Sequence, residues 1–102
     1  MTPFHRAAGV DDVPPGRDRV VEVQGRPIAL FHHAQQGWFA LDNTCRHQGG
    51  PLGEGAVEGT TVTCPWHGWR YDLASGRVLG QVAVGVRRYP VRVEGRDVLV
   101  EV

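Results

Sequence analysis

Two short segments contain both cysteines of this 102-residue chain, and each pairs a cysteine with a histidine. The first is Cys45-Arg46-His47 and the second is Cys64-Pro65-Trp66-His67, with sixteen residues between them. Glycine and proline flank or interrupt both segments, which predicts loops. Two thiolates and two imidazoles suit either a zinc ion or an iron–sulfur centre in which two histidines replace two cysteines. A fold that uses this ligand set must bring the two loops together.

The spacing of the ligands favours the iron–sulfur centre. Structural zinc sites usually take ligands in pairs separated by two or more residues, whereas a single residue separates Cys45 from His47. That short spacing is easier to satisfy if the two cysteines hold one iron and the two histidines hold the other. The plainest alternative, two buried cysteines and two core histidines, requires four unrelated residues to fall on this pattern by accident.

The pattern Cys-x-His followed by Cys-x-x-His resembles the Rieske 2Fe–2S family, and the likeness extends over CRHQGGPLGEG and CPWHGWRYDLASG. The resemblance implies an all-β, Rieske-type fold of three antiparallel sheets, with a small cluster-binding lobe inserted in a base domain. It also implies one 2Fe–2S cluster per chain. By position, Cys45 and Cys64 would bind the buried iron, and His47 and His67 the outer iron.

The same resemblance suggests roles for residues around the ligands. Tyr71 stands where a family tyrosine bonds a ligand sulfur, and Leu52 and Trp66 are expected to shield the cluster from water. Family members of respiratory bc complexes have an additional disulfide between the loops and a serine where this chain has Trp69. The family's cover loop is proline-rich, whereas residues 79–86 read LGQVAVGV. We therefore expect a reduction potential in the lower part of the Rieske range.

Three glycines of the ligand loops have a predicted role that depends on the missing side chain. Gly49, Gly50 and Gly68 would let backbone N–H groups approach the bridging sulfides closely. An ordinary turn glycine is an equally good interpretation of each.

The rest of the chain has the pattern of a β domain. Fourteen glycines and seven prolines punctuate short, valine-rich segments. Residues 61–63 and 69–72 are expected to lead into and out of the second ligand segment, which would lie at the end of a hairpin. The alternation predicts strands, with a turn at 25–27, over residues 4–8, 19–24, 28–33, 38–41 and 88–93. The last of these and a strand ending at Val102 should form a hairpin that completes the sheet begun at the N-terminus. We expect one domain, 1–102, with the lobe at about 43–82.

Charge and hydropathy exclude some partners. Eleven basic and eleven acidic residues give no net charge, so no basic field favours nucleic acid or an anionic membrane. No apolar run approaches a membrane-spanning length. If both cysteines bind iron, no cysteine is left for a disulfide, which suits a reducing compartment. With no hydrophobic signal segment at the start, we expect a cytoplasmic protein.

These observations predict an electron-transfer component and not an enzyme. The chain would carry one electron from a flavin-dependent NAD(P)H reductase to a terminal oxygenase, both bound transiently. The first alternative is the small subunit of an NAD(P)H nitrite reductase, and the second is a zinc-stabilised interaction module. His32 and His33 are neighbours on a predicted strand, face opposite ways and make a poor joint metal site.

Overall fold

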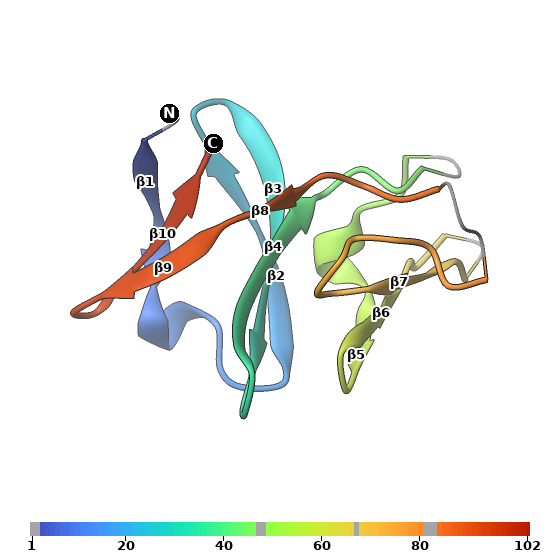
Figure 1. The fold of residues 1–102 in the computed structure, drawn as a ribbon, viewed down its shortest axis with the longest axis horizontal. Helices are drawn as coiled ribbons and strands as arrows, with labels where there is room; N and C mark the ends of the chain where they lie inside the picture. Colours follow the sequence, from blue (N-terminus) through green and yellow to red (C-terminus); the bar gives the residue numbers. More distant parts are fainter. Residues whose placement is uncertain (1–2, 47–48, 67, 81–83) are drawn as a thin grey trace.

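The computed structural model describes residues 3–46, 49–66, 68–80 and 84–102. Its strands form three antiparallel sheets of three, four and three strands (Figure 1). This confirms the predicted all-β architecture. His47 and His67, two of the four predicted ligands, lie outside the described residues. The helices of the described chain are short 3-10 turns, and none of them could cross a bilayer.

The four-stranded sheet is a meander extended by one short strand. Its order is β2 (Arg17–Val23), β3 (Arg26–His33), β4 (Gly37–Asp42), β8 (Arg88–Tyr89). The β2–β3 turn lies at Gln24 and Gly25, with φ of 53° and 76°, and not at 25–27 as predicted. Arg26 and Pro27 already belong to β3, because they pair with Val23 and Glu22. A two-residue turn of positive φ matches the twist of the strands that it joins.

The second sheet joins the two ends of the chain. Its order is β1 (Phe4–Gly9), β10 (Asp97–Glu101), β9 (Val91–Glu94), so the C-terminal hairpin does complete the N-terminal sheet. The predicted continuous strand over 88–93 is wrong. Tyr89 pairs with Ala40 of the four-stranded sheet, whereas Val91 pairs with Val100. Pro90 stands between them, and a proline has no N–H to continue a ladder. The chain changes sheet at this residue.

The third sheet belongs to a lobe inserted between β4 and β8 (Figure 1). It consists of β5 (Ala56–Glu58), β6 (Thr61–Thr63) and β7 (Arg70–Asp72), in that order. The short strand β5 is not among the predicted strands. Two 3-10 helices complete the elements: η1 (Val10–Asp12), which follows β1, and η2 (Leu52–Glu54), which precedes β5.

The four-stranded sheet separates two hydrophobic cores, and β3 contributes to both. Ile28 and Leu30 face the β1-β10-β9 sheet and pack with Val98 and Val100. Ala29 and Phe31 face the lobe. The lobe core consists of ten buried residues: Ala29, Phe31, Leu41, Cys45, Leu52, Val62, Cys64, Tyr71, Leu73 and Val78. Because both faces of β3 are buried, its central residues are uniformly apolar and do not alternate.

Candidate metal centre

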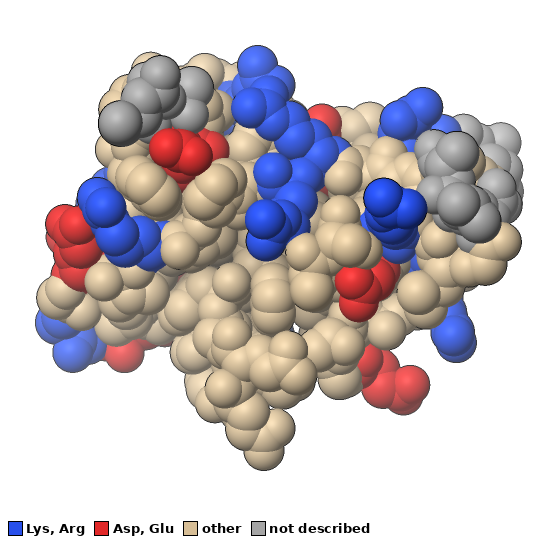
Figure 2. Space-filling model, viewed as in Figure 1, with Lys and Arg blue, Asp and Glu red and all other residues tan. Residues whose placement is uncertain are grey.

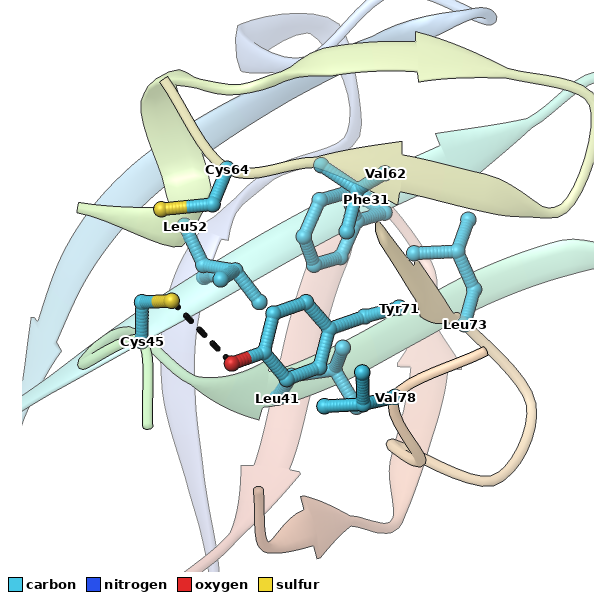
Figure 3. Packing of buried hydrophobic residues seen from close by; sticks show 10 residues of the cluster. Phe31, Leu41, Cys45, Leu52, Val62, Cys64, Tyr71, Leu73 and Val78 are labelled. Atoms are coloured by element: carbon cyan, nitrogen blue, oxygen red, sulfur yellow. Dashed lines mark hydrogen bonds between the residues drawn. The ribbon is translucent and has the colours of Figure 1, made fainter. Parts of the chain in front are cut away.

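The two cysteines lie in loops at the same end of the lobe core. Cys45 follows β4, and Cys64 directly follows β6. Neither takes part in a disulfide among the described residues, and both are almost completely buried, with 2% and 1% of their surface exposed. Figure 3 shows the two sulfur atoms at one side of the lobe core, with Leu52 beside them. The structure therefore brings together the two predicted sulfur ligands, which are nineteen residues apart in the sequence.

The first loop is closed on itself by backbone hydrogen bonds. The N–H of Cys45 donates to the carbonyl of Gly50, and the N–H of Gly49 donates to the carbonyl of Cys45, both at 2.9 Å. Gly49 has a φ of 76°, a conformation that glycine adopts without strain. A bridge between Thr44 and Pro51 closes the base of the loop. These bonds hold the Cys45 side chain toward the lobe core.

The second loop joins the two strands of a hairpin. Strands β6 and β7 are paired up to Thr63 and Arg70, and the N–H of Cys64 then donates to the carbonyl of Trp69 at 2.7 Å. Gly68 has a φ of 77°. This is the hairpin arrangement expected from the sequence, with the second ligand segment at its end.

The two loops meet at Gly50. A Cβ atom at this position would lie 2.8 Å from Sγ of Cys64 and 2.9 Å from Cγ of Trp66. Gly50 does not have a positive φ, so the requirement for glycine is one of space and not of backbone conformation. The first loop can approach the second thiol this closely only because residue 50 has no side chain.

Asn43 connects the first loop to the rest of the fold, a role that we did not predict. Its Oδ1 accepts the N–H of Gly53 at 2.8 Å, and its carbonyl accepts the N–H of Leu52 at 2.7 Å. Its own N–H donates to the carbonyl of Pro27 at 3.3 Å. Asn43 thus ties η2 to the base sheet. An asparagine directly after a strand is the sequence signal that could have revealed it.

Tyr71 makes the sulfur contact that the family resemblance implied. Its Oη lies 3.1 Å from Sγ of Cys45, and the N–H of Arg46 donates to the same oxygen at 2.9 Å (Figure 3). Burial, and then the hydrogen bond with Cys45, raises the pKa of Tyr71. The phenol therefore keeps its proton. Since its oxygen already accepts from Arg46, the O–H is available to donate to a Cys45 thiolate.

The electrostatics of Cys64 suit a metal ligand better than a nucleophile. Burial raises the pKa of its thiol, and the neighbouring Cys45 raises this pKa further. The N–H of Trp66 acts in the opposite direction and lowers it. A thiol that resists ionisation is a poor nucleophile. A metal cation would change the balance, because thiols that coordinate a metal are deprotonated. Two buried thiols side by side, each with a hydrogen-bond donor, fit an iron–sulfur centre.

The predicted shielding is partly present. Leu52 is completely buried beside the thiols, whereas Trp66 is 49% exposed. Val84 and Val86 pack against the lobe core, so valines cover part of the surface where the family has prolines. Residues 81–83 of that segment lie outside the described part of the chain.

The spare histidines are engaged elsewhere. His32 stacks on Trp38 with ring centroids 4.0 Å apart, and its Nδ1 lies 2.7 Å from the carbonyl oxygen of Val13. Nδ1 of His33 accepts the N–H groups of Gln35 and Gln36. The polar contacts of both rings are thus made with residues of the base domain.

Comparison with known proteins relates most of the chain to one family. Residues 4–90 match the family model of the Rieske [2Fe-2S] domain. The chain is 32% identical over 96 residues to the ferredoxin component of the naphthalene 1,2-dioxygenase system of Pseudomonas aeruginosa, a match that covers 93% of this chain and 91% of that protein.

Two solved structures are similar over nearly their full length. The ferredoxin of carbazole 1,9a-dioxygenase from Nocardioides aromaticivorans IC177 has a TM-score of 0.87 and 28% identity, with 98% of both chains covered. A protein assigned as the small subunit of an NADH-dependent nitrite reductase from Mycobacterium tuberculosis has a TM-score of 0.89 and 25% identity, covering 98% of this chain and 95% of that one.

Proposed function

This chain belongs to the Rieske 2Fe–2S family, and from that premise we propose that it carries single electrons from a flavin-dependent NAD(P)H reductase to a terminal oxygenase. Membership of the family implies a Rieske-type 2Fe–2S cluster. The names of the similar proteins, ferredoxin components of dioxygenase systems, support the role of a carrier that is not itself a catalyst. The reductase, the oxygenase and the direction of electron flow are part of the proposal.

We assign the cluster ligands as Cys45, His47, Cys64 and His67. The support is the spacing of the four residues and the convergence of the two buried thiols at Gly50. Two imidazoles in place of two thiolates make the bound cluster less negative, so that it accepts an electron at a higher potential than a four-cysteine cluster.

The surrounding residues stabilise negative charge on sulfur and keep water away from it. The O–H of Tyr71 is placed to donate to Cys45, and the N–H of Trp66 favours the thiolate of Cys64. Leu52 excludes water from between the loops. Hydrogen bonds to charged sulfur stabilise the reduced state, which carries the additional electron. The contact of 3.1 Å between Oη of Tyr71 and Sγ of Cys45 is the single observation that most supports an electron-transfer site.

A partner would approach the exposed side of the ligand loops. Pro65 and Trp66 are exposed there, and Leu79 is 43% exposed. A groove of about 310 Å³ between Gly68–Arg70 and Val78–Leu79 lies beside the second loop. A few exposed apolar side chains beside a shallow groove suit a transient redox encounter, which needs only a small interface.

The proposal can be tested on the purified protein. It should be red-brown, contain about two irons and two sulfides per chain, and take up one electron in a reductive titration. Stoichiometric zinc without labile sulfide would point to the zinc-stabilised interaction module instead and would exclude the carrier.

The small subunit of a nitrite reductase is the second candidate, because such a protein has a closely similar fold. The two candidates differ in how they bind their partners. A ferredoxin purified from its native cells should carry no bound partner. A reductase subunit should instead remain in a stable complex that reduces nitrite with NAD(P)H. The cytoplasmic location stays a prediction in either case.

A further inference from the structure

We propose that three exposed arginines, Arg46, Arg87 and Arg88, form a docking surface for an acidic face of the protein that exchanges electrons with this chain. We call these residues the arginine surface. The inference rests on the proposed function, because it concerns the partner that an electron carrier must meet. It adds a charged contact to the apolar patch around Trp66.

The arginine surface begins at the first ligand loop and continues onto the base domain. Arg46 follows Cys45, and its Nη1 donates to the carbonyl of Gly85 at 3.2 Å. Gly85 belongs to the segment that returns from the lobe to β8, where Arg87 and Arg88 lie. The guanidinium of Arg46 is thereby held across this returning segment. The three arginines are consequently close to the place where the electron would leave the protein.

The other two arginines also have defined positions. The guanidinium carbon of Arg87 lies 4.8 Å from the centroid of the Tyr89 ring, a cation–π contact that directs the side chain along the strand. Its carbonyl accepts the N–H of Asp42, and Arg88 pairs with Leu41 at the edge of the four-stranded sheet. Figure 2 shows basic side chains gathered over β8 and toward the lobe. All three side chains are exposed, so a partner can reach them.

The charged side chains of the whole chain sum to zero, but they are unevenly distributed along the sequence. Residues 43–88 contain five arginines and three acidic residues, whereas the rest of the chain contains six arginines and eight acidic residues. The three ion pairs found among the described residues use Arg6, Arg92 and Arg96, all in or beside the β1-β10-β9 sheet. Figure 1 places this sheet at the opposite end of the molecule from the lobe. The excess of positive charge in residues 43–88 equals the charge of Arg87 and Arg88, so it lies where the chain returns from the lobe to the base sheet.

The chemistry of the surface specifies its partner. All eleven basic residues of the chain are arginines. The planar guanidinium binds carboxylates through two parallel hydrogen bonds, which favours a partner face rich in aspartate and glutamate. Complementary charge raises the rate of encounter more than the final affinity, and salt weakens the effect.

The local field can be measured with two small oxidants of opposite charge, ferricyanide and hexaammineruthenium(III). Each takes one electron from the reduced protein, and its metal changes from the trivalent to the divalent state. In stopped-flow experiments, the rate constant for ferricyanide should fall as the ionic strength rises, although the charged side chains of the protein sum to zero. The rate constant for hexaammineruthenium should not fall.

Charge reversal identifies the residues that are responsible. The double variant Arg87→Glu/Arg88→Glu should slow oxidation by ferricyanide at low salt at least about fivefold and speed oxidation by hexaammineruthenium. The matched control, Arg92→Glu/Arg96→Glu, makes the same change of charge at the other end of the molecule and should change both rates much less, because it lies farther from the cluster loops (Figure 1). Poly-L-glutamate should inhibit oxidation of the wild type by ferricyanide and should not inhibit oxidation of the Arg87/Arg88 variant.

Several results would overturn the proposal. One is that the rate constants for both oxidants do not depend on salt. Another is that Arg92→Glu/Arg96→Glu changes the rates as much as Arg87→Glu/Arg88→Glu does. A third is that poly-L-glutamate does not inhibit oxidation of the wild type by ferricyanide. Binding to phosphatidylglycerol vesicles that is lost in Arg87→Glu/Arg88→Glu would assign the surface to anionic lipid instead. Failure of the proposed function is seen separately, because a protein without the cluster absorption would deliver no electron to either oxidant.

Discussion

Oη of Tyr71 lies 3.1 Å from Sγ of Cys45, and the same oxygen accepts the N–H of Arg46 at 2.9 Å. The backbone bond fixes the position of the phenol, and the O–H remains for the sulfur. The backbone N–H of Arg46 thus positions the phenol beside the Cys45 thiol, and the side chain of Arg46 belongs to the proposed docking surface.

Removing the phenol oxygen should lower the reduction potential without loss of the cluster. Tyr71→Phe deletes one hydrogen bond to a charged sulfur, and that bond is stronger when the cluster is reduced. A difference of about 1 kcal/mol between the two redox states corresponds to about 40 mV for a one-electron couple. Protein-film voltammetry measures the shift.

Tyr89→Phe is the matched control for this substitution. The Tyr89 hydroxyl is also buried but has no hydrogen-bond partner among the described residues, and it lies in the other core. The reduction potential of the Tyr89→Phe variant should equal that of the wild type. An unchanged potential in Tyr71→Phe, or equal shifts in both variants, would show that the contact with Cys45 does not tune the cluster.

The absolute potential should lie nearer −150 mV than +300 mV, the approximate limits of the Rieske range. The disulfide of the bc-type proteins cannot form, because both cysteines are assigned as ligands, and Trp69 replaces the serine that donates a further hydrogen bond. The single bond from Tyr71 compensates only in part. A midpoint well above zero at pH 7 would contradict this assessment of the cluster surroundings.

Replacing a ligand should remove the cluster and loosen the lobe. Cys64→Ser and His67→Ala should each lose the visible absorption and most of the iron. The melting temperature should also fall, because the free energy of metal binding contributes to folding. His32→Ala and His33→Ala serve as controls, since both rings are engaged outside the lobe. Loss of iron in either control would show that the ligand assignment is wrong.

A methyl group at residue 50 should force the two loops apart. The Cβ of Gly50→Ala would lie 2.8 Å from Sγ of Cys64, and overpacking of this kind typically costs about 1–3 kcal/mol. Iron content and the midpoint of urea unfolding should both decrease. Gly9→Ala is the control, because its nearest contact is at 3.3 Å, to a surface carboxylate oxygen of Asp12. Equal effects of the two substitutions would remove the special role of Gly50.

Asp18 should make the protein less stable as the pH rises through the weakly acidic range. Burial raises the pKa of Asp18 to about 6, with Arg17 lowering it and Glu54 raising it, and its Oδ2 has no hydrogen-bond partner among the described residues. The folded state therefore holds a proton that the unfolded chain has lost. Between about pH 4 and pH 6 the free energy of unfolding contributed by this group decreases.

Asp18→Asn should accordingly stabilise the protein more at pH 7.5 than at pH 4.5, as measured by urea unfolding at the two values. Glu22→Gln, at an exposed position of the same strand, is the control. It should change the free energy of unfolding by the same small amount at both pH values. A stabilisation by Asp18→Asn that is independent of pH would show that the carboxyl is not protonated in the folded protein near pH 5.

The Cys-x-His and Cys-x-x-His segments, the alternation of Val98 and Val100, and the hairpin around the second ligand loop could all be predicted from the sequence. Each is a local pattern, in which the spacing of a few neighbouring residues determines the chemistry or the buried face. The family resemblance added the position of Tyr71. These signals were sufficient to predict the fold class and to single out the thiols of Cys45 and Cys64.

The tertiary structure decided what depends on contacts between distant segments. Gly50 is required by Cys64 of the other loop, and Asp18 is half-buried although it lies among charged neighbours in the sequence. Likewise, Pro90 divides one apparent strand between two sheets, and β3 is buried on both faces. Such features follow from how elements pack against each other, and alternation along one segment carries no information about its distant neighbours.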